Sequence, residues 1–131
     1  MSKYLADTYG FVEALVGNPR YERIMAAPSV VTTAQNVMEL HYALSVKGFA
    51  PGEVDRVAQG ALKRVVEVAP EVAVQASRTR LAANQAQRAA RSPVRMSYVD
   101  AWGYEAARSL GLLFLTGDPL FRRMHGVEFV R

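Results

Sequence analysis

The stretch LLFLTGD, residues 112–118, indicates the fold class of this 131-residue chain. It opens with four large apolar residues in a row, which is the pattern of a strand that is buried on both faces. Such strands belong to parallel sheets that helices cover on each side. Gly117 and Asp118 interrupt the apolar run, so a carboxylate stands at the carboxyl end of the predicted strand.

Strands and helices alternate on both sides of this stretch. Further strands are predicted at 3–7, 28–32, 65–68 and 127–130, although 65–68 also fits the end of a helix. The spacing of apolar residues predicts helices at 11–16, 19–25, 37–48, 52–63, 70–90 and 97–110, and a short one that begins at Asp118-Pro119. This alternation predicts one α/β domain over residues 1–131, with a mostly parallel sheet between helices.

The composition excludes several classes of protein. The chain has no cysteine, which rules out disulfides and thiolate metal sites. No stretch approaches the ~18 uncharged apolar residues of a membrane helix. Asp7 interrupts the amino terminus before a signal peptide could form. We therefore expect a soluble, cytoplasmic protein with no membrane association.

The charge balance is basic, with a formal net charge of +4 at pH 7. Only Lys3, Lys47 and Lys63 are lysine, and every other basic residue is arginine. Arginine binds phosphates through a flat bidentate fork, so this balance favours a polyanionic partner. A genome-wide preference for arginine codons would produce the same composition.

One segment, from Val72 to Val99, contains arginines and no acidic residue. The arginines are Arg78, Arg80, Arg88, Arg91 and Arg95. The segment leads directly to Asp100, and a basic arm beside an acidic pocket suits an RNA backbone that enters a metal site. The alternative is the solvated face of a surface helix.

Three of the four aspartates stand at junctions between predicted elements. Asp7 and Asp118 each follow a strand, at the edge of a parallel sheet where ligands bind. Asp100 lies in the first turn of a helix that begins at Ser97, where the helix dipole favours a negative charge. Each aspartate taken alone also fits a cap or a turn, so the hypothesis of an acidic site depends on the set.

Glu39 is the fourth candidate acid of this site. It interrupts a helical stripe of apolar residues, and a carboxylate among core-forming side chains is costly to desolvate unless a cation offsets the charge. The alternative is that Glu39 faces solvent from the edge of the helix. His41 and His125 lack the spacing of a zinc site, and we expect His41 to pack or hydrogen-bond beside Glu39.

Four short motifs resemble those of PIN-domain ribonucleases, most closely the VapC-type toxins of toxin–antitoxin pairs. The motifs are YLADTY at 4–9, NVMELHYAL at 36–44, SYVDA at 97–101, and FLTGD at 114–118 with Phe121. The closing GVEFV at 126–130 fits the last strand of the family, so the resemblance covers nearly the whole chain. It implies a five-stranded parallel sheet flanked by helices in three layers, a homodimer, and an antitoxin that blocks the acidic cleft.

The resemblance also implies roles for individual residues. Asp7, Glu39 and Asp100 match the near-invariant metal-binding acids, and Asp118 matches the more variable fourth acid. Thr8 and Thr116 match small hydroxyl residues that support the site. There are departures at His41, where such toxins often carry tyrosine, at Tyr9-Gly10, and at Pro119-Leu120, where no further acid follows. The last departure leaves one or two metal ions as alternatives.

The expected activity is that of a Mg²⁺- or Mn²⁺-dependent endoribonuclease, the toxin of a VapBC-type system. Carboxylates are the ligands that these hard cations prefer, and a metal-acidified water would attack the RNA phosphorus in line. One alternative is a PIN-like RNA-binding or scaffold module without catalysis. Another is a small-molecule phosphohydrolase with Asp7 as nucleophile, but that chemistry usually needs an aspartate at position 9, which is tyrosine here.

Overall fold

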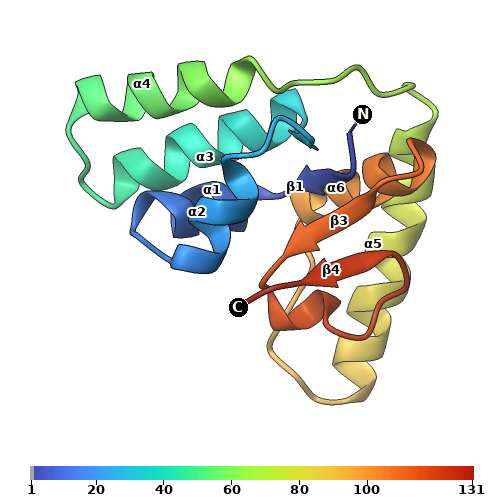
Figure 1. The fold of residues 1–131 in the computed structure, drawn as a ribbon. Helices are drawn as coiled ribbons and strands as arrows, with labels where there is room; N and C mark the ends of the chain where they lie inside the picture. The colour runs from blue at the N-terminus through green and yellow to red at the C-terminus, as the bar shows by residue number, and fades with distance from the viewer. Residues whose placement is uncertain (1) are drawn as a thin grey trace.

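The structure, a computed structural model, describes residues 2–131 (Figure 1). Four strands alternate with six α-helices and one short 3-10 helix within these residues. In chain order the elements are β1 (Tyr4–Ala6), α1 (Thr8–Leu15), α2 (Pro19–Met25), β2 (Val30–Val31), α3 (Ala34–Val46), α4 (Pro51–Leu62), α5 (Val72–Ala89), α6 (Tyr98–Ser109), β3 (Leu113–Thr116), η1 (Pro119–Phe121) and β4 (Val127–Phe129).

The four strands form one sheet in the order β2-β1-β3-β4, and all three neighbouring pairs are parallel. Phe114 and Leu115 of β3 are fully buried, as the apolar run predicted. The α/β fold with a parallel sheet flanked by helices is therefore confirmed.

Helices cover both faces of the sheet. Leu5 and Phe114 point to one face and pack in a cluster with residues of α5 and α6. Ala6 and Leu115, the next residue along each strand, point to the other face and pack with Tyr21 of α2. Residues of α3 and α4 form a third cluster against α1, and these two helices lie side by side at the upper left of Figure 1.

The predicted strand at 65–68 is wrong in extent. Val65 forms one isolated parallel bridge with Thr32, at the end of β2, and the ladder goes no further. The backbone then turns toward α5, and Pro70 has no N–H to donate to a neighbouring strand. The sheet thus has four strands and a single bridge at the place of the expected fifth.

The ends of the helices also differ from the prediction. α5 begins at Val72, and Pro70 lies in the preceding turn, where its carbonyl accepts from the N–H of Ala73 at 3.1 Å. α1 and α3 begin three residues earlier than predicted, directly after Asp7 and Thr33, whose side chains cap them. Apolar spacing marks the buried face of a helix, whereas the capping residues determine where it begins. None of the helices described in residues 2–131 is long and apolar enough to cross a membrane.

Candidate active site

Asp7 lies at the carboxyl end of β1 and is almost completely buried. One carboxylate oxygen accepts from the N–H of Gly10 at 3.3 Å and so caps α1. The other accepts from the Thr116 hydroxyl at 2.6 Å. Burial, opposed by the Thr116 bond and reinforced by the nearby charges of Asp100 and Glu39, raises the pKa of Asp7 to about 7.

Thr116 connects the ends of the two central strands. It is fully buried at the end of β3, directly beside the end of β1, where Ala6 pairs with Leu115. Its hydroxyl donates to Asp7 and accepts from the backbone N–H of Asp118 at 3.1 Å. One hydroxyl therefore sets the positions of two of the predicted site acids.

Asp100 enters the same neighbourhood from the start of α6. Ser97 and Asp100 form both bonds of a capping box, each 3.0 Å long, between the side chain of one and the backbone N–H of the other. Burial raises the pKa of Asp100, the two bonds with Ser97 lower it, and the charge of Asp118 raises it further. The charges of Asp100 and Asp118 thus act on each other across the sheet edge.

Glu39 approaches from α3 and is half-buried. Burial is the main cause of its raised pKa, the Thr8 hydroxyl opposes the shift, and the charge of Asp100 adds to it. The hydrogen bond that the Thr8 hydroxyl donates goes to the carbonyl of Asn36, one turn earlier on α3, at 3.3 Å, and so ties the start of α1 to α3. The structure therefore brings all four predicted acids to one edge of the sheet, each from a different segment.

These four acids match the donor preference of a hard divalent cation, but they are not arranged as a finished ligand set. Among residues 2–131, no group of three or more His, Asp or Glu side chains stands where it could hold a metal ion. The three aspartates are used as caps instead: Asp7 for α1, Asp100 for α6, and Asp118 for η1 through the N–H of Leu120. The donor chemistry fits Mg²⁺ or Mn²⁺, and ligation would require these side chains to turn toward one another.

The expected contact between His41 and Glu39 is wrong. Residues two positions apart on an α-helix point to nearly opposite sides, because each residue turns the helix by about 100°. His41 is exposed on α3, and its Nε2 lies 3.4 Å from a carboxylate oxygen of Asp55 on α4.

Two of the five arginines predicted to bind RNA already donate hydrogen bonds to backbone carbonyls. Arg80 donates from Nε to the carbonyl of Met96 at 3.1 Å, and its guanidinium carbon lies 4.0 Å from the centre of the Tyr98 ring. Arg95 donates to the carbonyls of Ser92 and Val94, both at 2.7 Å. The other three arginines, Arg78, Arg88 and Arg91, are exposed.

Gly117 is a positioning residue that the sequence analysis did not single out. A Cβ atom at this position would collide with the ring of Tyr9 and with the carbonyl of Val130. Tyr21 donates to that same carbonyl at 2.6 Å, so the end of the chain is held against the turn that carries Asp118. The glycine between Thr116 and Asp118 was the sequence signal for this close approach.

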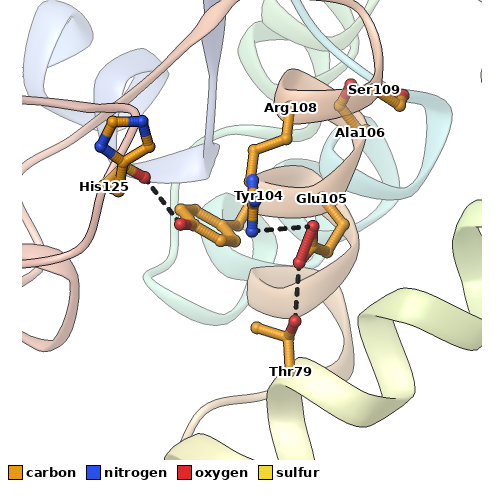
Figure 2. A network of polar contacts seen from close by, with 7 residues as sticks. All are labelled: Thr79, Tyr104, Glu105, Ala106, Arg108, Ser109 and His125. Atoms are coloured by element: carbon orange, nitrogen blue, oxygen red, sulfur yellow. Dashed lines mark hydrogen bonds and ion pairs between the residues drawn. The ribbon is translucent and has the colours of Figure 1, made fainter.

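A polar network on α6, which Figure 2 shows, was not evident from the sequence. Glu105 is buried, accepts from the Thr79 hydroxyl of α5 at 2.6 Å, and lies 3.5 Å from Arg108. Tyr104 donates to the carbonyl of His125, ahead of β4, at 2.6 Å. The network fastens α5 and the segment before β4 to the helix that carries Asp100.

No protein-family model matches this sequence, and no curated protein matches it. Solved structures do. A chain of a toxin–antitoxin complex from Klebsiella pneumoniae has a TM-score of 0.72 at 14% identity, and the match covers 96% of each chain. A chain of the DNA-bound VapBC of Salmonella typhimurium has a TM-score of 0.69 at 20% identity, covering 99% of this chain and 98% of that one.

VapC20 of Mycobacterium tuberculosis, a toxin that cleaves the sarcin–ricin loop, has a TM-score of 0.54 at 22% identity, covering 84% of this chain and 85% of that one. These identities show the fold alone. At that level the resemblance to VapC-type PIN-domain toxins is confirmed over nearly the full length of the chain.

Proposed function

We propose that this chain is a metal-dependent endoribonuclease and the toxin of a VapBC-type pair. One observation carries the proposal: four acids from four segments meet at the carboxyl edge of a parallel sheet, and mutual repulsion contributes to the raised pKa values of three of them. The shared fold with VapC20, which cleaves the sarcin–ricin loop, supports RNA as the substrate class.

Asp7, Glu39, Asp100 and Asp118 would hold one or two Mg²⁺ or Mn²⁺ ions. When bound, such an ion supplies Lewis acidity, which acidifies a water and offsets the charge of a phosphate group. Asp7 and Asp100 are our candidates for direct ligands. Glu39 would act through a water, and Asp118 would either hold a second ion or orient the attacking water.

Two side chains of the site have a defined task. Asp7 must lose its proton, because only a carboxylate binds a cation, and a pKa of about 7 allows this near neutral pH. The Thr116 hydroxyl donates to one oxygen of Asp7 and so orients the carboxylate. Attack by water on phosphorus breaks the bond to the 3′ oxygen, which takes up a proton, so the products carry a 3′-hydroxyl and a 5′-phosphate.

Exposed arginines would bind the RNA backbone outside the acidic site. Arg78, Arg88 and Arg91 are accessible for this role, whereas Arg80 and Arg95 already donate to backbone carbonyls. We therefore assign most of the phosphate binding of the α5 segment to the first three.

An antitoxin and a second copy of the chain are the proposed protein partners. The solved structures of this fold include toxin–antitoxin complexes, which supports the antitoxin. Tyr42 and Val46, one turn apart on α3, expose most of their apolar surface, and a homodimer would bury it. Size-exclusion chromatography with light scattering tests the dimer.

The decisive experiment compares cleavage of structured RNAs, including a sarcin–ricin hairpin and transfer RNA, in Mg²⁺, Mn²⁺ and EDTA. Asp100→Asn is the test variant. Asp55→Asn is the matched control, because Asp55 is an exposed aspartate of α4 that pairs with His41. We expect cleavage in Mg²⁺ or Mn²⁺ only, lost in Asp100→Asn and kept in Asp55→Asn. Equal cleavage in all samples would identify a contaminating nuclease and overturn the proposal.

A PIN-like RNA-binding module without catalysis is the second candidate. The use of Asp7, Asp100 and Asp118 as helix caps favours it, because a cap oxygen competes with a metal for the same lone pairs. RNA binding that persists in EDTA, together with no cleavage in any metal, would select this alternative.

A further inference from the structure

Tyr98 is the first residue of α6. With a relative exposure of 72%, it is the most exposed of the large apolar residues within residues 2–131. A single exposed tyrosine is ordinary, but this ring is held in place. The Arg80 guanidinium carbon lies 4.0 Å from the ring centre, and the Arg80 Nε is fixed by the carbonyl of Met96. One face of the ring is therefore covered by the Arg80 guanidinium, and the rest of the ring is exposed to solvent.

The ring lies in a groove next to the helices that carry two of the acids, and none of the four acids lines that groove. Tyr98 is two residues before Asp100, and it lines a groove of about 520 Å³ between α3, α5 and α6. Met38, the neighbour of Glu39, lines the same groove from α3, and Trp102 lines it from α6. A ligand on Tyr98 thus adjoins the two helices that deliver Glu39 and Asp100.

The charge around the ring selects the class of ligand. No acidic residue occurs between Val72 and Val99, and the cation at the ring is Arg80, since no charged residue among those described lines the groove itself. A protein partner laid over Tyr98 would also cover this cation and would have to neutralise it. A nucleotide meets both demands, because its base stacks on a tyrosine ring while its phosphate faces arginine.

We propose that Tyr98 stacks on one unpaired nucleobase of the RNA, outside the acidic site, and that Arg80 holds the ring in place. The inference rests on the proposed function, since it names how the substrate of that site is positioned. A rigid ring loses little conformational freedom on binding, so the stacking energy is retained as affinity. The contact is sequence-tolerant, because every base has a flat face.

The test measures binding without cleavage, by fluorescence anisotropy of a labelled single-stranded RNA in EDTA. Tyr98→Ala removes the ring and is expected to weaken binding about tenfold or more. Tyr98→Phe keeps the ring and should bind within about twofold of the parent. Leu62→Ala is the control, because Leu62 is an exposed apolar residue at the end of α4, outside the groove, and its binding should not change.

An abasic scan of the same RNA locates the partner base. Loss of one particular base should weaken binding to the parent protein and leave binding to Tyr98→Ala unchanged, since the two changes remove the same contact. The proposal is overturned if Tyr98→Ala binds like the parent, or if Leu62→Ala loses as much. It is also overturned if Tyr98→Ala shifts the oligomeric state and leaves RNA binding intact, because the ring would then belong to a protein interface.

The binding assay separates this inference from the proposed function. An absence of cleavage in Mg²⁺ and Mn²⁺ would overturn the proposed ribonuclease activity, whereas the stacking measurement in EDTA would remain valid. Conversely, metal-dependent cleavage with the same kcat/KM in Tyr98→Ala as in the parent would support the proposed ribonuclease activity and overturn the proposed stacking contact.

Discussion

Two buried carboxylates, Asp7 and Glu105, differ in what surrounds them. Asp7 is 5% exposed and Glu105 is 4% exposed, so both are removed from water to the same degree. Each accepts from a threonine hydroxyl at 2.6 Å. Glu105 also has a cation beside it, Arg108, whereas the charged neighbours that act on Asp7 are other acids.

The difference distinguishes a structural acid from a candidate metal ligand. A buried charge is tolerated where the protein supplies the opposite charge, as it does at Glu105. At Asp7 the described residues supply more negative charge instead, which a cation from outside would offset. The neighbouring charges, rather than the burial, therefore support Asp7 as a ligand of the proposed metal site.

The largest expected effect is on cleavage. Asp7→Asn should reduce metal-dependent cleavage by more than about a hundredfold, because even a partner outside the ligand shell of a metal contributes ten- to a hundredfold. Glu105→Gln keeps an acceptor for Thr79 and should stay within about threefold of the parent. Initial rates at saturating Mn²⁺ measure both, and a comparable loss in Glu105→Gln would erase the distinction.

The same two substitutions should have opposite effects on the free energy of unfolding. Glu105→Gln weakens the bond from Thr79 and removes the ion pair with the half-exposed Arg108, so it should lower the free energy of unfolding by about 1 kcal/mol. Asp7→Asn removes a repelled buried charge and should raise it by about 1 kcal/mol at pH 8 in EDTA. Urea denaturation followed by circular dichroism measures both values. A lower stability of Asp7→Asn would show that its bonds to Thr116 and Gly10 outweigh the repulsion.

The pH dependence sharpens the comparison further. The pKa of Asp7 is raised from 3.8 to about 7 in the folded chain, so the stability that its neutral form contributes is fully present below about pH 4 and is lost as the pH rises to about 7. Mn²⁺ binds the ionised form, so the increase in Tm between EDTA and Mn²⁺ should grow from pH 5.5 to pH 8. Asp7→Asn should lack this growth, and an increase that does not vary with pH would contradict the assignment.

The smallest effect concerns the network around Glu105. Tyr104→Phe removes the bond to the His125 carbonyl and should lower the free energy of unfolding by about 1 kcal/mol. Cleavage per folded molecule should not change. A loss of cleavage without a loss of stability would mean that the network also sets the position of Asp100.

The fold was predictable because its signals are local. The apolar run at 112–116 and the helical spacing of apolar residues report burial directly, and both are confirmed. The place where the ladder stops at Val65 was not predictable, because a single bridge depends on how the backbone turns after α4. The first residues of α1 and α3 depend on the caps Asp7 and Thr33, which apolar spacing does not report.

The convergence of the candidate acids was predictable, and the details of their contacts were not. Asp7 and Asp118 follow neighbouring parallel strands, so the topology alone brings them to one edge. The hydrogen bonds that occupy their oxygens depend on side-chain rotamers, which no sequence pattern fixes. Glu105 escaped notice because its partner Thr79 lies on another helix, and His41 was misplaced because its direction depends on the turn of α3.

The single bridge between Thr32 and Val65 has a consequence for how such chains diverge in length. The connection from Glu67 to Pro70 contributes no acid to the site and forms no ladder with the sheet beyond that bridge, although Val68 packs against the core. Residues inserted at the exposed Ala69 and Pro70 lengthen a surface loop at little cost. One inserted residue within β1 would instead turn Asp7 to the opposite face of the sheet. Length variation should therefore accumulate between α4 and α5 and be absent from β1 and β3.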